Sequence, residues 1–333
     1  MIFDAMLPDI IDSAEHSAVQ ESVGFRTTWT TETSRDPFVE LTVASERTTT
    51  IGLGTAVSVA FARNPMSMAI TANHVHQLSG GRLLLGLGTQ VKAHIERRFG
   101  MPWSHPAARM REYVVALHAI WRSWNTDEPL NFDGRFYRHS LMPPLFDPGR
   151  NPFGTPPVYL AGVGERMATV AGEVAEGFLA PPLATTTYLR EVLLPAVSAG
   201  RLHAESFTAN TGFQTCVMPL VATGEGPVEM DAAIEATRVR LAFYASTPAY
   251  RNILKLHGWV AVSDQLGNCA RRHEWTEMPK FISDTMLDAF AVVAPPNEVT
   301  NTLRDRYGEL ADRVIMYPVQ PWSFDLTAQV LRL

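Results

Sequence analysis

Short apolar runs alternate with longer segments of helical periodicity along most of the chain. In residues 78–90, LSGGRLLLGLGTQ, a polar turn leads into a continuous apolar run that ends in Gly-Leu-Gly-Thr. This pattern is typical of a buried parallel strand whose C-terminal end lets another molecule approach the backbone. Residues 49–59 predict a second strand with the same ending, and residues 64–78 predict the helix between the two. The three segments therefore predict a βαβ unit.

The same alternation predicts eight strands joined mainly by helices. The expected strands are residues 2–7, 25–32, 49–59, 78–90, 158–164, 178–183, 213–223 and 312–319. The expected helices are residues 9–24, 36–48, 64–78, 106–124, 165–177, 185–204 and 295–310, with a mostly helical stretch from 231 to about 290. Pro195 is expected to bend or divide the helix that contains it.

Eight strands that alternate with helices over 333 residues match the count of a (β/α)8 TIM barrel. A doubly wound open sheet is the competing interpretation, but it usually has fewer strands and would need a domain boundary that the sequence does not show. We therefore expect one α/β domain over residues 1–333, with insertions at about 125–157 and 227–290. The first insertion contains LNFDGRFYRH, which predicts a β-hairpin.

Composition excludes several classes of function. The net charge is −6 and no Lys/Arg-rich run is present, which argues against nucleic acid as a partner. Cys216 and Cys269 lie far apart without a CxxC motif, so we expect reduced core thiols and no metal site. No segment resembles a signal peptide or approaches the ~18 apolar residues of a membrane span. We expect a cytoplasmic protein that does not bind membranes.

Five motifs in a compatible order carry a family resemblance over nearly the whole chain. They are Glu32 followed by DPF, then GTAVSVAFARNP, LSGGRLLLGLGTQ, AHIERRFGMPW and YLAGVGERMATVAGEVAEGF. Together they resemble the luciferase-like monooxygenase superfamily of flavin and deazaflavin oxidoreductases, and within it the group that depends on coenzyme F420, a 5-deazaflavin. The resemblance implies a luciferase-like (β/α)8 barrel with insertions, a small-molecule organic substrate and a homodimer.

In TIM barrels the active site lies at the C-terminal ends of the strands. The expected cofactor-binding residues at these ends are Thr31, Thr55, Ala56, Val57, Thr89, Gln90, Ala161, Gly162, Val163 and Gly164. The resemblance places the cofactor ring against the third strand and implies a cis peptide bond between Ala56 and Val57. A plain β-bulge beside Gly54 is the alternative.

The segment AGVGER, residues 161–166, resembles the phosphate loop of the family. Its glycines let backbone amides approach an anion, and the helix that follows directs its N-terminal dipole to the same place. Arg166 adds a charge-assisted contact. A tight strand-to-helix turn that uses glycine for steric reasons is the alternative interpretation.

Glu32 and His94 are the candidate catalytic residues. Glu32 stands at a strand end, where a carboxylate can exchange a proton or hold the ring by a hydrogen bond. Capping of the turn at Asp36 is its structural alternative. His94 follows the fourth strand in a segment expected to cover the pocket, and a surface position on a short helix is the alternative there.

Two departures from the family pattern narrow what the resemblance implies. Related sugar-phosphate dehydrogenases carry Asp-His and Gly-Glu where this chain has Glu32-Thr33 and Gln90-Val91, so sugar-phosphate oxidation is not implied. The F420-dependent group usually has Ala-Asp-Gly before the sixth strand and His-Pro after it, whereas this chain has residues 175–177, Ala-Glu-Gly, and Pro181-Pro182. The missing histidine predicts a changed substrate pocket.

Three functional hypotheses follow. The first is hydride transfer between coenzyme F420 and an organic substrate, for which the protein positions the ring and excludes water. The second keeps the barrel with FMN as the cofactor of a monooxygenase, and the third is a barrel without catalysis that serves as a subunit. The aromatic segment FYASTPAYRNILKLHGW in the second insertion fits a substrate entrance, a dimer interface or the packing of the insertion itself.

Overall fold

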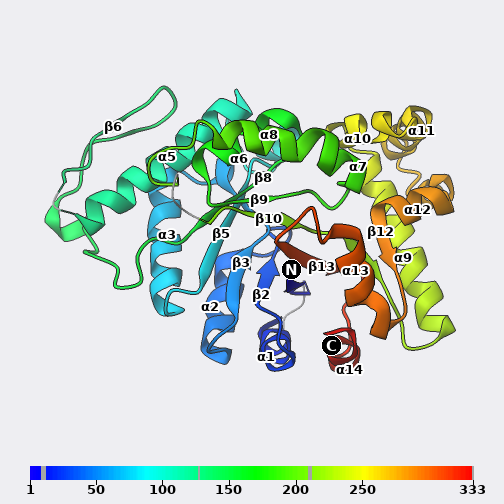
Figure 1. Ribbon diagram of the computed structural model, residues 1–333. Helices are drawn as coiled ribbons and strands as arrows, with labels where there is room; N and C mark the ends of the chain where they lie inside the picture. The colour runs from blue at the N-terminus through cyan, green and yellow to red at the C-terminus, as the bar shows by residue number, and fades with distance from the viewer. Residues whose placement is uncertain (9–12, 127, 209–211, 332–333) are drawn as a thin grey trace.

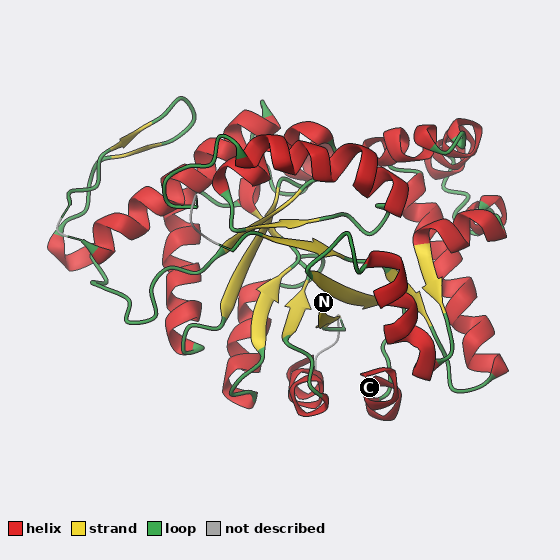
Figure 2. Ribbon diagram, in the orientation of Figure 1, coloured by secondary structure: helices red, strands yellow, loops and turns green. Residues whose placement is uncertain are grey.

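Eight parallel strands form a closed barrel in which the first strand pairs with the last (Figures 1 and 2). The computed structural model describes residues 1–8, 13–126, 128–208 and 212–331. In barrel order the strands are β1 (Ile2–Met6), β2 (Thr27–Thr30), β3 (Gly52–Thr55), β5 (Leu83–Gly88), β8 (Val158–Ala161), β9 (Gly177–Leu179), β10 (Gln214–Val217) and β13 (Arg313–Pro318). The pairing of β1 with β13 excludes the open sheet and confirms the predicted TIM barrel.

Three short strands extend this barrel. β4 (Ser58–Val59) pairs with β5, while β11 (Leu220–Ala222) pairs with β13 and with β12 (Ala291–Val293). The single strand expected over 213–223 is therefore divided between β10 and β11. Pro219 lies at the division, and a proline cannot donate to the hydrogen-bond ladder of a sheet.

Helices surround the barrel (Figure 2). Those between or after the barrel strands are α1 (Ser13–Val23), α2 (Pro37–Arg47), α3 (Pro65–Leu78), α4 (Lys92–Arg97), α5 (Pro106–Asn125), α6 (Glu165–Val174), α7 (Thr186–Tyr188), α8 (Leu194–Arg201), α13 (Val299–Tyr307) and α14 (Phe324–Leu331). Residues 9–12 of the first expected helix lie outside the described residues. A π-helical turn, Leu189–Leu193, precedes Pro195 and interrupts the helix expected over 185–204.

The beginnings of two helices show why the sequence starts them where it does. Asp36 accepts a hydrogen bond from the backbone N–H of Phe38, and Asn64 accepts one from Ser67. A proline follows each of these residues at the first helical position, where a missing N–H carries no cost.

The two predicted insertions have different structures. In the first, β6 (Phe132–Asp133) pairs antiparallel with β7 (Arg138–His139), as expected, and this hairpin extends away from the barrel (Figure 1). The second consists mainly of α9 (Pro227–Ala245), α10 (Arg251–Leu256), α11 (Val260–Arg271) and α12 (Asp284–Phe290), and it ends in β12. Among the described residues, no helix is both long enough and apolar enough to span a membrane.

Aromatic side chains fill the middle of the barrel. Trp29 and Tyr159 are buried there with their rings edge to face at 5.8 Å. Gly54 and Gly177 make this possible, because a Cβ atom at either position would overlap the Trp29 or the Tyr159 ring. The barrel interior is therefore a packed core up to the level of these rings.

A buried ion pair lies below the rings, near the N-terminal ends of the strands. Arg313 donates from Nε and Nη2 to the two carboxylate oxygens of Asp4, at 2.8 and 2.9 Å, and Trp29 Nε1 donates to the same carboxylate at 3.0 Å. Asp4 is 0% exposed and Arg313 is 7% exposed. Because Asp4 belongs to the first strand and Arg313 to the last, the pair stands at the closure of the barrel.

A second buried pair of titratable groups lies outside the barrel. His118 on α5 stacks on Phe207 at 4.0 Å, and its Nε2 is 3.9 Å from the Glu176 carboxylate, which accepts a hydrogen bond from Val158 N–H. Burial raises the pKa of Glu176 to about 7 and lowers the pKa of His118 to about 3. In the folded protein, Glu176 therefore stays protonated up to a higher pH than in the unfolded chain, and His118 stays unprotonated down to a lower pH.

We expect Arg313→Met to lower the free energy of unfolding by about 3–5 kcal/mol, because Asp4 then remains buried without its counter-ion. Urea denaturation measures the change. The control is Arg138→Met, whose partner Asp133 is exposed like Arg138 itself, and it should change the stability by less than about 1 kcal/mol. Equal effects of the two variants would contradict a special role for the buried pair.

We expect Glu176→Gln to be more stable than the wild type above pH 7, by on the order of 3 kcal/mol, and to lose this advantage below pH 4.5. The reason is the sign of the shift: the folded chain binds the Glu176 proton more tightly than the unfolded chain, so its contribution to stability disappears as the pH rises from 4.5 to about 7. Urea denaturation at several pH values tests this, with the exposed Glu128→Gln as control. A stability difference that does not change with pH would contradict the assignment.

Candidate functional site

Small residues line the part of the C-terminal barrel mouth that β3, β5 and β8 form. Side chains alternate along a strand, so the positions two residues beyond the buried rings also face the interior. Ala56 and Ala161 belong to the same interior cluster as Trp29, and Gly88 ends β5 at this level. The bulky core thus stops below small residues on this side of the mouth, whereas Leu179, Met218 and Tyr317 continue it on the side of β9, β10 and β13. The mouth is the end where TIM barrels carry their sites.

The end of β3 has the backbone geometry that the resemblance implied. The peptide bond between Ala56 and Val57 is cis. Ala56 N–H donates to Thr30 O at 2.7 Å, and Val57 O accepts from Glu32 N–H at 3.2 Å, so this turn is bonded to the end of β2. Thr55 is fully buried and its hydroxyl donates to Gly86 O at 2.6 Å, which commits that hydroxyl to the barrel wall.

The Glu32 carboxylate accepts several hydrogen bonds from residues near the end of β3. It accepts hydrogen bonds from Val59 N–H at 2.8 Å, from the Ser58 hydroxyl at 3.2 Å and from Arg63 Nη1 at 2.7 Å. Arg63 also binds Asp36 at 2.8 Å. The Glu32 side chain is only 8% exposed. Its hydrogen bonds to Ser58, Val59 and Arg63 join the segment after β2 to the segment after β3. Asp36 rather than Glu32 caps α2.

The residues after β5 form a turn that leads into a short helix. Thr89 donates from its hydroxyl to Gln90 O at 2.9 Å, and Gln90 has a positive φ of 60°. His94 is exposed on α4, whereas its neighbour Ile95 is buried. Glu96 pairs with Lys92 across one turn, as expected for the surface of a short helix.

The segment after β8 presents a helix N-terminus to the mouth. Gly164 is extended at the N-cap position of α6, and no side chain caps the helix there. The first backbone amides of a helix have no partner within it. Tyr188 donates from its hydroxyl to Val163 O at 3.0 Å and so fixes the turn, while Arg166 is exposed in the first turn of α6. Such a terminus is suited to bind an anion.

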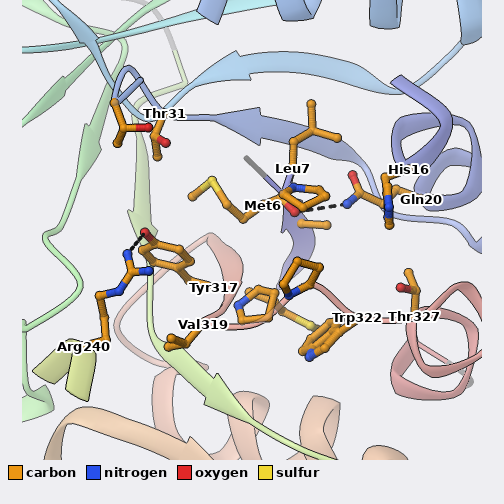
Figure 3. A pocket seen from close by; sticks show the side chains of 16 residues that line it. Met6, Leu7, His16, Gln20, Thr31, Arg240, Tyr317, Val319, Trp322 and Thr327 are labelled. Atoms are coloured by element: carbon orange, nitrogen blue, oxygen red, sulfur yellow. Dashed lines mark hydrogen bonds between the residues drawn. The ribbon is translucent and has the colours of Figure 1, made fainter. Parts of the chain in front are cut away.

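A cavity of about 260 Å³ opens where the ends of β1, β2 and β13 meet (Figure 3). Its described lining consists of Ala5, Met6, Leu7, Pro8, His16, Gln20, Thr31, Thr33, Arg240, Met316, Tyr317, Pro318, Val319, Pro321, Trp322 and Thr327. Of the predicted site residues, Thr31 alone lies in this lining. Glu32 also follows β2 but lies outside the lining, and the other predicted positions lie at or after the ends of β3, β5 and β8, farther along the barrel rim.

Sequence reasoning did not find Arg240 and Tyr317. Arg240, on α9, donates from Nη1 to the Tyr317 hydroxyl at 3.0 Å, and the Tyr244 hydroxyl is 3.5 Å from that of Tyr317. Tyr317 could have been found, since it follows the interior residue Ile315 by two positions on the last strand. Arg240 could not, because nothing in its helix indicates a partner 77 positions away.

Comparison with known proteins adds three findings. An uncharacterized protein of Mycobacterium tuberculosis is 45% identical over 313 residues, which cover 94% of this chain and 92% of that protein. The 5,10-methylenetetrahydromethanopterin reductase of Archaeoglobus fulgidus is 27% identical over 293 residues, which cover 86% and 82% of the two chains. The solved structure of the coenzyme F420 dependent tetrahydromethanopterin reductase from Methanopyrus kandleri superposes with a TM-score of 0.79 at 19% identity, covering 99% and 97%.

The model of the luciferase-like monooxygenase family matches residues 7–313, from the end of the first barrel strand to the start of the last. This match spans most of the chain and includes the ends of β2, β3, β5 and β8 described above. The chain therefore belongs to the luciferase-like monooxygenase family.

Proposed function

We propose that this protein is an oxidoreductase that transfers hydride between coenzyme F420 and a small organic substrate. The observation that carries the proposal is the position of the uncapped N-terminus of α6 beside the small residues that line the β3, β5 and β8 side of the barrel mouth. The similarity of this chain to a 5,10-methylenetetrahydromethanopterin reductase over most of both chains supports a redox role.

The residues of the mouth fit a cofactor with a flat ring and a phosphate. The backbone amides after Gly162 and Gly164, together with Arg166, would hold the phosphate, because helix N-termini and guanidinium groups both favour anions. The ring would contact Thr31, the turn at Ala56 and Val57, and Ala161, with the segment at Thr89 and Gln90 beside them. Bound F420 would supply the hydride donor or acceptor, and the protein would position it and exclude water.

Glu32 and His94 have different roles in this proposal. Because the Glu32 carboxylate already binds Val59 N–H and Arg63, we propose that it positions the turn beneath the ring. His94 stays the proposed proton-handling group: it is exposed on α4 after β5, and imidazole is the side chain that most readily exchanges a proton near neutral pH.

We expect the purified apoprotein to bind F420 with micromolar affinity and FMN much more weakly, as measured by quenching of intrinsic tryptophan fluorescence in separate titrations. Arg166→Gln should weaken F420 binding by about tenfold through loss of a charge-assisted contact to phosphate. Arg138→Gln, in the distant hairpin, is the matched control and should bind normally. A preference for FMN would replace the proposal by a flavin monooxygenase, and binding of neither cofactor would favour a barrel without catalysis.

We expect Glu32→Gln to lower the free energy of unfolding by about 1–3 kcal/mol, since Arg63 loses a nearly buried charged partner. F420 affinity should fall as well, while the shape of the pH–rate profile should persist. The exposed Glu96→Gln serves as control. If Glu32→Gln instead keeps normal stability and affinity but loses one limb of the pH–rate profile, Glu32 exchanges a proton and the positioning role is wrong.

A further inference from the structure

We propose that Arg240 and Tyr317 form a carboxylate-binding subsite in the cavity at the ends of β1, β2 and β13, and that its ligand is an organic acid with an apolar body. This subsite deepens the proposed function. It rests on that function only in taking the acid to be the substrate of the enzyme. Neither the family match nor the motifs of the sequence point to these two residues.

Arg240 has no acidic partner within the part of the chain that the structure describes. Among the described residues, no Asp or Glu side chain forms an ion pair with Arg240, although its guanidinium is only partly exposed and lines the cavity. Its neighbour Arg238, two positions earlier on the same helix, is bound by Asp284 and by Ile282 O. A partly buried cation without a counter-ion is costly, so a cavity that contains one favours an anionic ligand.

Tyrosine hydroxyl groups lie beside the Arg240 guanidinium. Tyr317 accepts a hydrogen bond from Arg240 at 3.0 Å, so the Tyr317 hydroxyl hydrogen can point either to the Tyr244 hydroxyl, 3.5 Å away, or to a bound acceptor. The rings of Tyr244 and Tyr250 lie 5.8 Å apart. Burial raises the pKa of Tyr250 to about 12 and that of Tyr244 well above its usual value. These phenols are therefore neutral near pH 7, so they do not neutralise Arg240.

The remaining walls of the cavity are mainly apolar. Figure 3 shows Arg240 and Tyr317 on one side of the cavity, with Met6 and Val319 near them and the Trp322 ring on the other side, near Thr327. Such walls suit a hydrocarbon or aromatic body, while the guanidinium suits one charged end.

The charge of the lining distinguishes a carboxylate from a phosphate. Arg240 is the single Arg or Lys residue in the described lining. One guanidinium and one hydroxyl match the charge and the donors that a monoanionic carboxylate requires, whereas a phosphate dianion would keep an uncompensated charge. The cavity also adjoins Thr31 at the rim, so an acid held there would lie at the barrel mouth.

The test uses isothermal titration of the full-length protein with benzoate, with its neutral isostere benzamide and with inorganic phosphate. We expect the wild type to bind benzoate with a Kd of about 1–10 mM and at least tenfold more tightly than benzamide or phosphate. In Arg240→Gln the preference for benzoate over benzamide should disappear, in Arg240→Lys it should return in part, and in the matched control Arg238→Gln it should remain. Thermal denaturation of each variant verifies that it is folded.

Separate titrations with F420 distinguish this inference from the proposed function. Unchanged F420 affinity in Arg240→Gln, with the benzoate preference lost, supports the subsite. Three results would overturn it: wild type that does not prefer benzoate to benzamide, stronger binding of phosphate than of benzoate, or a loss of F420 affinity in Arg240→Gln, which would assign Arg240 to the cofactor. A wild type that prefers benzoate but does not bind F420 would overturn the proposed function alone.

Discussion

The contact between Asp4 and Arg313 is the constraint on which the barrel depends. A parallel barrel is complete only when its first strand pairs with its last, and these two strands are separated by almost the whole chain. A bidentate ion pair directly inside this seam favours one register of β1 on β13, because a shift of either strand would leave a buried charge unpaired. Trp29 donates to the same carboxylate, so the pair also orients the largest side chain of the interior. The closure and the packing of the interior are therefore coupled.

The barrel interior has a packed base below its C-terminal rim. The aromatic rings of Trp29 and Tyr159 occupy the middle level, and Gly54 and Gly177 give them room. Above them, on the side of β3, β5 and β8, the interior positions are alanine and glycine, so backbone forms much of that part of the rim. A site made of backbone places few demands on side-chain identity, which suits a cofactor that many related proteins would share. By contrast, longer side chains from β13 and α9, those of Tyr317 and Arg240, line the cavity beside Thr31.

The sequence predicted those features that depend on local pattern. Strands with glycine-marked ends, helices begun by Asp36 and Asn64, and the hairpin of the first insertion all follow from spacing and turn chemistry. β12 was missed because three residues between a helix and two prolines are too short to show a period. Glu32 was correctly placed at a strand end, yet its binding to Arg63 joins residues 31 positions apart and has no local signature. Contacts between distant segments, such as Arg240 with Tyr317, are decided by the fold and are invisible to periodicity.

The link between Arg240 and Tyr317 has a further consequence for how such a barrel can change its substrate. Tyr317 belongs to the same strand as Arg313, so one strand joins the base of the barrel to the rim. Arg240, by contrast, comes from an inserted helix that contributes nothing to the closure of the barrel. A substitution at position 240 can therefore alter the charge of the cavity without disturbing the seam, whereas changes in β13 affect both. Under the proposed role of this cavity, substrate specificity is most easily modified from α9, because that helix lies outside the ring of paired barrel strands.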